Sequence, residues 1–198
     1  VLAGLSACGL AALALASFVH PLPRLIYNPS DSVPVGWYRI EPAQSLHVGS
    51  IVLTTLPADA AALAAQRGYL PSHVPLLKRV GAVAPQHVCI VNGIVRIDGA
   101  PVAAVLRADR WNRPLPSWPQ CRPLAQGELF LLSSTNPASF DSRYFGPVST
   151  SAVIGVARGR LNLTSIMDSL IEALRTSVAI YTILIGAVLS PTDPVFAS

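Results

Sequence analysis

The chain has 198 residues, of which 52% are hydrophobic and 12% are charged, and its mean hydropathy is +0.50. This composition is unusual for a wholly soluble protein and indicates membrane association, while the length left after a membrane segment suits one compact domain. The formal net charge is +4, but the arginines are scattered and lack interleaved aromatic residues, so nucleic acid is not expected as a partner.

The first predicted element is an apolar helix over residues 1–19, VLAGLSACGLAALALASFV, which carry no charge. Such a helix is about 28 Å long, close to the ~30 Å hydrocarbon core of a bilayer. We therefore predict a transmembrane anchor over residues 1–20. A cleaved signal peptide is the alternative, because the small residues of ALASF fit a cleavage site. LSAC at 5–8 resembles a lipoprotein cleavage box, but the apolar run continues well beyond Cys8, so this interpretation is rejected.

Residues 25–160 are predicted to form a mainly β domain, because their apolar runs are short and bounded by turn residues. Strands are predicted at 50–56, 74–84, 128–134 and 150–161, with Gly155 as a bulge in the last of these. A short helix is predicted at 59–67 and ends at Gly68.

Residues 87–105 contain two turn pairs, Asn92–Gly93 and Asp98–Gly99, and the first predicts a tight hairpin. Residues 106–123 are rich in arginine, proline and tryptophan and are predicted to form an extended loop. The densest basic group is interpreted as part of a solvated surface and comprises Arg107, Arg110, Arg113 and Arg122.

Cys89 and Cys121 flank this hairpin and most of the loop. Outside the cytoplasm they are expected to form a disulfide, whereas the alternative is two unrelated buried thiols. The spacing of histidine, cysteine and acidic residues does not indicate a metal site, and no cofactor is expected.

Residues 161–198 form a hydrophobic C-terminal tail whose helical periodicity becomes fully apolar near its end. The uncharged core from Ser177 to Leu189 is short for a membrane span. Three interpretations stay open: an interfacial or partner-binding helix, a second span that includes Glu172 and Arg175, or an extension from a neighbouring reading frame that starts at Met167.

Two residues are candidates for catalysis. Ser32 lies in NPSDSVPVGWY (28–38), a stretch rich in turn-forming and hydroxyl residues. A serine hydroxyl needs a base, and a lysine that burial keeps neutral can serve as one. Lys78 is the one lysine in the sequence, and by strand alternation it shares a face with Leu76 and Val80. The alternative is a lysine that snorkels to the domain surface.

A third segment, STNPASFDSRYFGPV (134–148), is rich in polar residues and alone would indicate a hydrogen-bonded loop. In this order, SDSVPVGWY, PLLKRVGAVA and SFDSRYFGPV resemble the nucleophile, lysine and third boxes of the signal-peptidase-I-like Ser-Lys proteases. They are most similar to the TraF branch of conjugative-transfer peptidases. The resemblance covers about residues 15–160 and implies a signal-peptidase-like β-fold catalytic domain over 25–160.

The resemblance also implies residue roles. Ser32 would be the nucleophile and Lys78 the general base. Ser30 would supply an oxyanion-hole hydroxyl beside the backbone N–H of Ser32. In the third box, one serine would orient the lysine, an ion pair would support the site, and the aspartate is also a candidate catalytic group; these residues are Ser139, Asp141 and Arg143.

The function that the resemblance implies is a membrane-anchored serine endopeptidase that processes, and in this branch can cyclise, a pilin precursor in conjugative transfer. It would be a single-pass protein of the bacterial inner membrane with a periplasmic catalytic domain. Its partners would be membrane lipid, the pilin precursor or another exported preprotein, and other transfer or type IV secretion components. Val33, Val35 and Trp37 are expected to dip into the membrane interface.

Three alternatives are weighed against this function. One is a general type I signal peptidase that removes signal peptides from exported preproteins, and another is a non-catalytic assembly factor of the transfer apparatus. A self-cleaving repressor with a Ser-Lys pair would need an N-terminal helix-turn-helix, where this chain has an apolar segment. Val33 and Pro34, next to the nucleophile, differ from the pattern of housekeeping leader peptidases.

Overall fold

The computed structural model describes residues 25–133 and 135–161, together with individual positions between 164 and 178. The chain divides into two compact units, Val1–Arg160 and Leu161–Ser198. The predicted anchor over residues 1–20 lies outside the described residues. Among those that are described, no helix is long and apolar enough to cross a membrane. The described tail positions are helical, and the roles of the anchor and the tail stay predictions.

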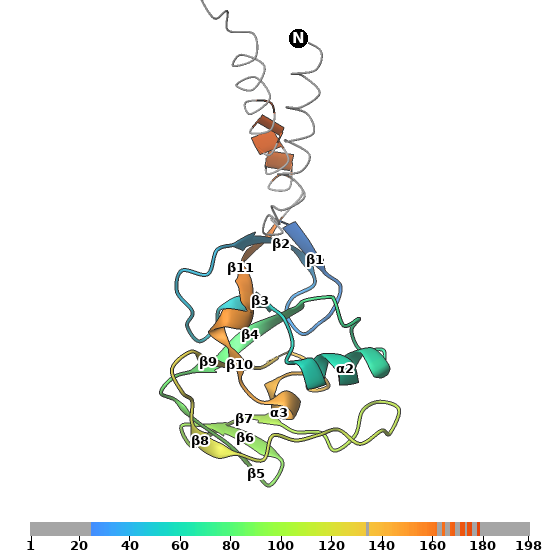
Figure 1. The fold of residues 1–198 in the computed structure, drawn as a ribbon, viewed down its shortest axis with the longest axis vertical. Coiled ribbons are helices and arrows are strands. Elements are labelled where there is room, and N and C mark those ends of the chain that lie inside the picture. Colours follow the sequence, from blue (N-terminus) through green and yellow to red (C-terminus); the bar gives the residue numbers. More distant parts are fainter. Residues whose placement is uncertain are drawn as a thin grey trace, which may run out of the picture. The chain divides into compact units, whose positions relative to one another are not determined.

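The first unit is mainly β and contains two sheets (Figure 1). The larger has seven strands in the order β1-β2-β11-β3-β4-β9-β10. Their bounds are Leu25–Asn28 for β1, Gly36–Glu41 for β2, Ile51–Thr54 for β3, Leu76–Val83 for β4, Glu128–Leu131 for β9, Val148–Ser149 for β10 and Val153–Leu161 for β11.

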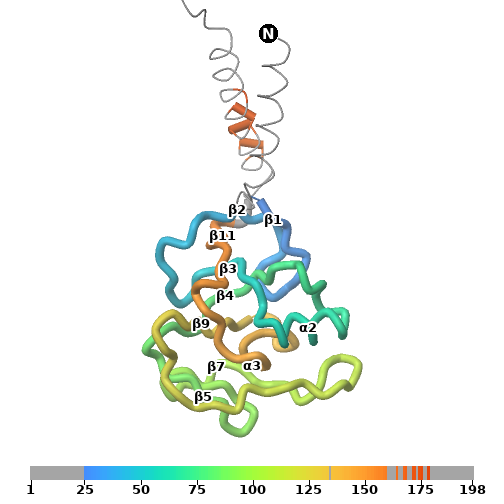
Figure 2. The backbone as a smooth tube through the Cα atoms, in the orientation of Figure 1, coloured from blue at the N-terminus to red at the C-terminus, as the bar shows by residue number. Residues whose placement is uncertain are grey.

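The smaller sheet has four strands in the order β7-β6-β5-β8. Its strands are β5 (His87–Val91), β6 (Ile94–Ile97), β7 (Ala100–Ala104) and β8 (Cys121–Pro123). The described part of this unit also contains three short helical elements: α2 (Ala58–Gln66), α3 (Ser142–Phe145) and the 3-10 turn η1 (Thr150–Ala152). The segment that follows β7 runs on the same side of the unit as α2, as the yellow-green part of the tube shows (Figure 2).

Strand β4 is an interior strand of the larger sheet and pairs antiparallel with both β3 and β9. Its sequence, LLKRVGAV, is long and apolar because the strand is covered along most of its length. Apolar side chains from β4 enter all three core clusters: Leu77 packs with Val33 and Leu53, Val80 with Leu131, and Ala82 with the core of the smaller sheet. A polar side chain on this strand is therefore placed in an apolar setting.

The predicted elements within the body are largely confirmed. The strands predicted at 50–56, 74–84 and 128–134 correspond to β3, β4 and β9, and the helix predicted at 59–67 corresponds to α2. Asn92–Gly93 and Asp98–Gly99 form the two turns of the meander β5-β6-β7, and all four residues have positive φ, as two-residue hairpin turns of the primed type require.

The last predicted strand, 150–161, begins later than expected, because its first residues form η1 before β11. Gly155 lies at a register shift between β11 and β3, as the predicted bulge requires. A Cβ atom there would lie 2.6 Å from the carbonyl oxygen of Glu41. The close approach of β2 therefore explains why this position is glycine.

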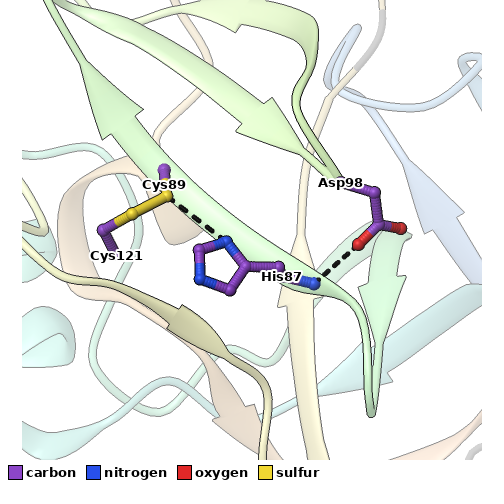
Figure 3. Close-up of a disulfide and its surroundings, with 4 residues drawn as sticks. All are labelled: His87, Cys89, Asp98 and Cys121. Atoms are coloured by element: carbon purple, nitrogen blue, oxygen red, sulfur yellow. Dashed lines mark hydrogen bonds between the residues drawn. A yellow bond between two sulfur atoms is a disulfide. The ribbon is translucent and has the colours of Figure 1, made fainter.

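Cys89 on β5 lies directly opposite Cys121 on β8, and the two form a disulfide (Figure 3). The ring Nδ1 of His87 lies 3.4 Å from the sulfur of Cys89, and its backbone N–H donates to Asp98. The side chains of His87, Cys89 and Cys121 lie close enough together to bind a metal ion, but thiolates bind metals and a disulfide does not. The cluster therefore ties β8 to the smaller sheet and holds no metal in this oxidation state.

Replacing both cysteines, Cys89→Ser with Cys121→Ser, should lower the free energy of unfolding by about 3–4 kcal/mol, because the disulfide closes a segment with a sequence separation of 32 residues. Chemical denaturation of the two proteins measures this difference. Alkylation of the unreduced, unfolded wild type followed by mass analysis is the control. Modification at Cys89 or Cys121 would contradict the disulfide.

Candidate active site

The structure brings Ser32, Lys78 and Ser139 together from three separate segments. Ser32 lies in the loop between β1 and β2, Lys78 is in β4, and Ser139 lies in the loop before α3. The Nζ atom of Lys78 is hydrogen-bonded to both serine hydroxyls, and the two hydroxyl oxygens are 3.2 Å apart. All three side chains are buried, with Lys78 only 2% exposed. Lys78 is thus a core residue and does not snorkel to the surface.

Burial lowers the pKa of Lys78 from its ordinary value of 10.5 to about 8. Desolvation is the largest cause, because a charged ammonium is disfavoured where water cannot reach it. The negative charges of Asp141 and Asp31 raise the pKa, and the positive charge of Arg143 lowers it. A large fraction of Lys78 is consequently a neutral amine near pH 8, which is the form that can accept a proton.

Asp141 and Arg143 form a fully buried ion pair. Two parallel contacts of 2.8 Å join the guanidinium to the carboxylate, and Asp141 also caps the start of α3. The guanidinium also donates to four carbonyl oxygens, those of Ala104, Asn136, Pro137 and Ser139. Burial alone would lower the pKa of Arg143, but the Asp141 carboxylate raises it, so the arginine stays charged. The pair therefore fixes the loop that carries Ser139.

The Ser32 loop is tied to this third segment. The hydroxyl of Ser133 donates to the carbonyl oxygen of Ser32 at 2.8 Å, and that of Thr135 donates to the carbonyl oxygen of Asp31 at 2.7 Å. The backbone N–H of Ser133 in turn donates to Asp141. The ion pair and the Ser32 loop thus belong to one hydrogen-bonded network.

Asn28, which sequence reasoning missed, organises the Ser32 loop from within. Its buried amide nitrogen donates to the carbonyl oxygens of Ser30, at 2.6 Å, and Val33, at 3.0 Å. Its amide oxygen accepts from the backbone N–H and the hydroxyl of Ser30. The signal was present, because an asparagine ahead of proline and serine commonly closes such a turn.

Two sequence expectations for this loop need restating. The hydroxyl of Ser30, expected in an oxyanion hole, lies 2.8 Å from the amide oxygen of Asn28 and uses its one proton there. Val33, expected to be exposed, is 1% exposed and packs in the core, whereas Val35 and Trp37 are exposed as predicted. The loop turns Val33 inward because it lies beside Ser32, next to the covered strand β4.

A cavity of about 400 Å³ opens beside the cluster of Ser32, Lys78 and Ser139. Ser32, Lys78 and Ser139 line one part of it, and Asp31 lies at the same part. The rest is formed by leucines and aromatic side chains of other segments: Leu56, Tyr69, Leu70, Leu106, Trp111 and Phe140. This space is large enough to hold several side chains of a peptide.

Comparison with known proteins relates this geometry to a family. The family model described as "Signal peptidase, peptidase S26" matches residues 1–161. The chain is 32% identical over 168 residues to the plasmid transfer protein TraF of Escherichia coli, covering 80% of this chain and 93% of that protein. It is 39% identical over 148 residues to the conjugal transfer protein TraF of Agrobacterium fabrum, covering 66% and 78% of the two chains.

Among solved structures, a signal peptidase I from Enterococcus faecalis matches with 18% identity and a TM-score of 0.37. The match covers 57% of this chain and 97% of that one.

Replacing Asn28 with alanine should loosen the Ser32 loop selectively. We expect the free energy of unfolding to fall by about 1–3 kcal/mol, because buried carbonyl groups lose their donors. Hydrogen exchange of the backbone N–H groups of residues 30–33 should accelerate more than exchange in β4.

The matched control is Thr54→Val, which removes a buried hydroxyl that donates to Ala152 in another part of the unit. It should lower stability without selective exchange at 30–33. Unchanged exchange at these positions in the Asn28→Ala protein would contradict the role of Asn28.

Proposed function

The chain belongs to the signal peptidase family, peptidase S26, and from this premise we propose that it is a serine endopeptidase with a Ser32–Lys78 dyad. The observation that carries the proposal is the buried hydrogen bond between Lys78 Nζ and Ser32 Oγ, together with a lysine pKa of about 8. A base with a pKa near the working pH combines a usable neutral fraction with good proton affinity.

In the proposed reaction, neutral Lys78 takes the proton of Ser32 while the serine oxygen attacks the carbonyl carbon of the scissile bond. The resulting ammonium gives this proton to the leaving amine, which yields an acyl-enzyme. Water, or an amine in the case of cyclisation, then attacks the ester and gives its proton to Lys78. Lys78 passes this proton to Ser32 Oγ as the ester bond breaks, which releases the product and restores the neutral amine. Ser139, hydrogen-bonded to Lys78, keeps the amine directed at Ser32 throughout.

The backbone N–H of Ser32 is the proposed donor to the oxyanion, because it makes no hydrogen bond within the described part of the chain. Ser30 can serve as a second donor once its hydroxyl turns away from Asn28. Asp141 and Arg143 support the site by fixing the Ser139 loop, and Asp141 also acts on Lys78 through its charge.

The proposed substrate is a pilin precursor of a conjugative transfer system, since the curated relatives are described as plasmid or conjugal transfer proteins. The second candidate is a general signal peptidase acting on exported preproteins, which the description of the family model favours. We place the catalytic domain in the periplasm, anchored in the inner membrane by residues 1–20. The disulfide supports this location, because disulfides persist in oxidising compartments.

Intact-mass analysis of the pilin should find the mature form in cells with the wild type and only the precursor with Ser32→Ala or Lys78→Ala. A product lighter by one water than the linear form indicates cyclisation. Mature pilin in all three strains would remove the protease proposal for this substrate and favour the assembly-factor alternative.

Because protonated Lys78 cannot act as a base, kcat/KM for peptide cleavage should rise about tenfold per pH unit below pH ~8 and level off above it. Asp31→Asn removes a negative charge that raises the pKa of Lys78, so its profile should shift to lower pH. A shift to higher pH, or a profile without a step near pH 8, would contradict Lys78 as the base.

A further inference from the structure

The segment 107–115 forms an ordered hairpin that contributes Asp109, Arg110, Trp111 and Leu115 to the cavity lining. Ala108 and Pro114 form a β-bridge, and the backbone N–H of Leu115 donates to the carbonyl of Arg107 at 2.9 Å. The carboxylate of Asp109 lies inside the hairpin and accepts from two of its backbone N–H groups and from the guanidinium of Arg113. The loop predicted over 106–123 is confirmed, since the described residues between β7 and β8 contain no strand or helix, and within this loop Asp109 organises residues 107–115.

Asp109 also joins the hairpin to the segment after α2, since the hydroxyl of Tyr69 donates to its carboxylate at 2.5 Å. The rings of Tyr69 and Trp111 are stacked with centroids 6.4 Å apart. Arg113 lies over the Trp111 ring at 4.5 Å. The tip of the hairpin is consequently held in one position relative to the cavity.

This arrangement leaves one cation at the tip, Arg110. Its guanidinium lies over the Trp111 ring at 3.8 Å, and within the described chain it has no hydrogen bond or ion pair. The neighbouring Asp109 cannot neutralise it, because that carboxylate is already occupied by Tyr69 and Arg113. Arg110 and Trp111 line the same cavity as Ser32.

The surroundings favour an anion. Four arginines belong to the hairpin and the segment after α2, where the described carboxylate is that of Asp109: Arg67, Arg107, Arg110 and Arg113. The other carboxylate of the cavity lining, Asp31, lies next to Ser32. The cavity lining is largely apolar, so charges there are less screened than in bulk water. A guanidinium already stacked on an aromatic ring also loses little freedom when it binds a planar anion.

We propose that Arg110, held over Trp111, forms a carboxylate subsite of the substrate cavity, an inference that rests on the proposed endopeptidase function. The preferred substrate carries an acidic side chain, or its free terminal carboxylate, separated from the scissile bond by apolar residues. The carboxylate binds the guanidinium through two parallel hydrogen bonds, which is the geometry that this pair favours. Arg110 is thus a specificity-determining residue. It binds the substrate carboxylate, while Ser32 and Lys78 of the same cavity cleave the peptide bond.

The test uses the full chain in detergent micelles with Ser32→Ala, so that binding is measured without cleavage. The probes are fluorescein-labelled peptides with one apolar sequence, carrying Glu, Gln or Lys at a single position scanned along it. Each is made with a free and an amidated C-terminus. The peptide that presents the bound carboxylate should bind about tenfold more tightly than its neutral counterpart. For a side-chain carboxylate this comparison is Glu against Gln, and for the terminal carboxylate it is free acid against amide. Survival of the preference after amidation identifies a side-chain carboxylate, and its loss identifies the terminal one.

Arg110→Glu should reverse the preference in favour of the Lys peptide, and binding of that peptide also shows that the variant is folded. Arg107→Glu is the matched control, because it makes the same charge change in the same hairpin without lining the cavity. It should leave the preference within about twofold. Equal binding of all peptides, absence of binding, or equal effects of the two variants would overturn the subsite.

Cleavage assays with Ser32 intact separate this inference from the proposed function. Cleavage of Glu and Gln peptides with equal kcat/KM overturns the subsite and supports the peptidase. Absence of cleavage together with an intact binding preference contradicts the peptidase and leaves the subsite standing as a binding site.

Discussion

The buried ion pair between Asp141 and Arg143 sets the arrangement on which the site depends. Arg143 is fully buried and donates to four carbonyl oxygens in addition to the carboxylate. A charge in this position is tolerable only while every one of its protons has an acceptor. Removing either partner of a pair like this typically costs about 3–5 kcal/mol. The loop that carries Ser139 therefore has one permitted position, next to Lys78.

The same pair leaves burial as the main influence on the pKa of Lys78. Asp141 raises the pKa of the lysine and Arg143 lowers it, so their charges act in opposite senses. Desolvation is then the dominant effect, and the balance favours the neutral amine. Without Arg143, the Asp141 carboxylate would raise the pKa of Lys78 and enlarge the fraction held as an ammonium, which cannot serve as a base. The ion pair thus supplies rigidity without imposing a net charge on the site.

The sequence predicts those parts of the fold and site that depend on local pattern. Alternation along 74–84 places Lys78 on a covered face, and the pairs Asn92–Gly93 and Asp98–Gly99 mark the turns of the meander. The hydrogen bonds of Asn28 are local to its own loop, and the sequence carries their signal. The inward turn of Val33 could not be predicted, because it depends on packing against side chains of β3 and β4, far along the chain. The hairpin at 107–115 was missed for a related reason: its stability comes from the Asp109 carboxylate, whose partner Tyr69 lies 40 residues away.

Lys78 is the one lysine in the sequence, and it lies in the core with a pKa of about 8. Across the whole chain, isotope-labelled lysine therefore introduces a single side-chain probe, and that probe is the proposed base itself. Its ¹⁵N or ¹³C resonance would follow protonation of the amine directly, without assignment of any other lysine signal. The scarcity of this residue makes the site spectroscopically unique, and it also confines lysine-directed covalent chemistry to the position where it would block the enzyme.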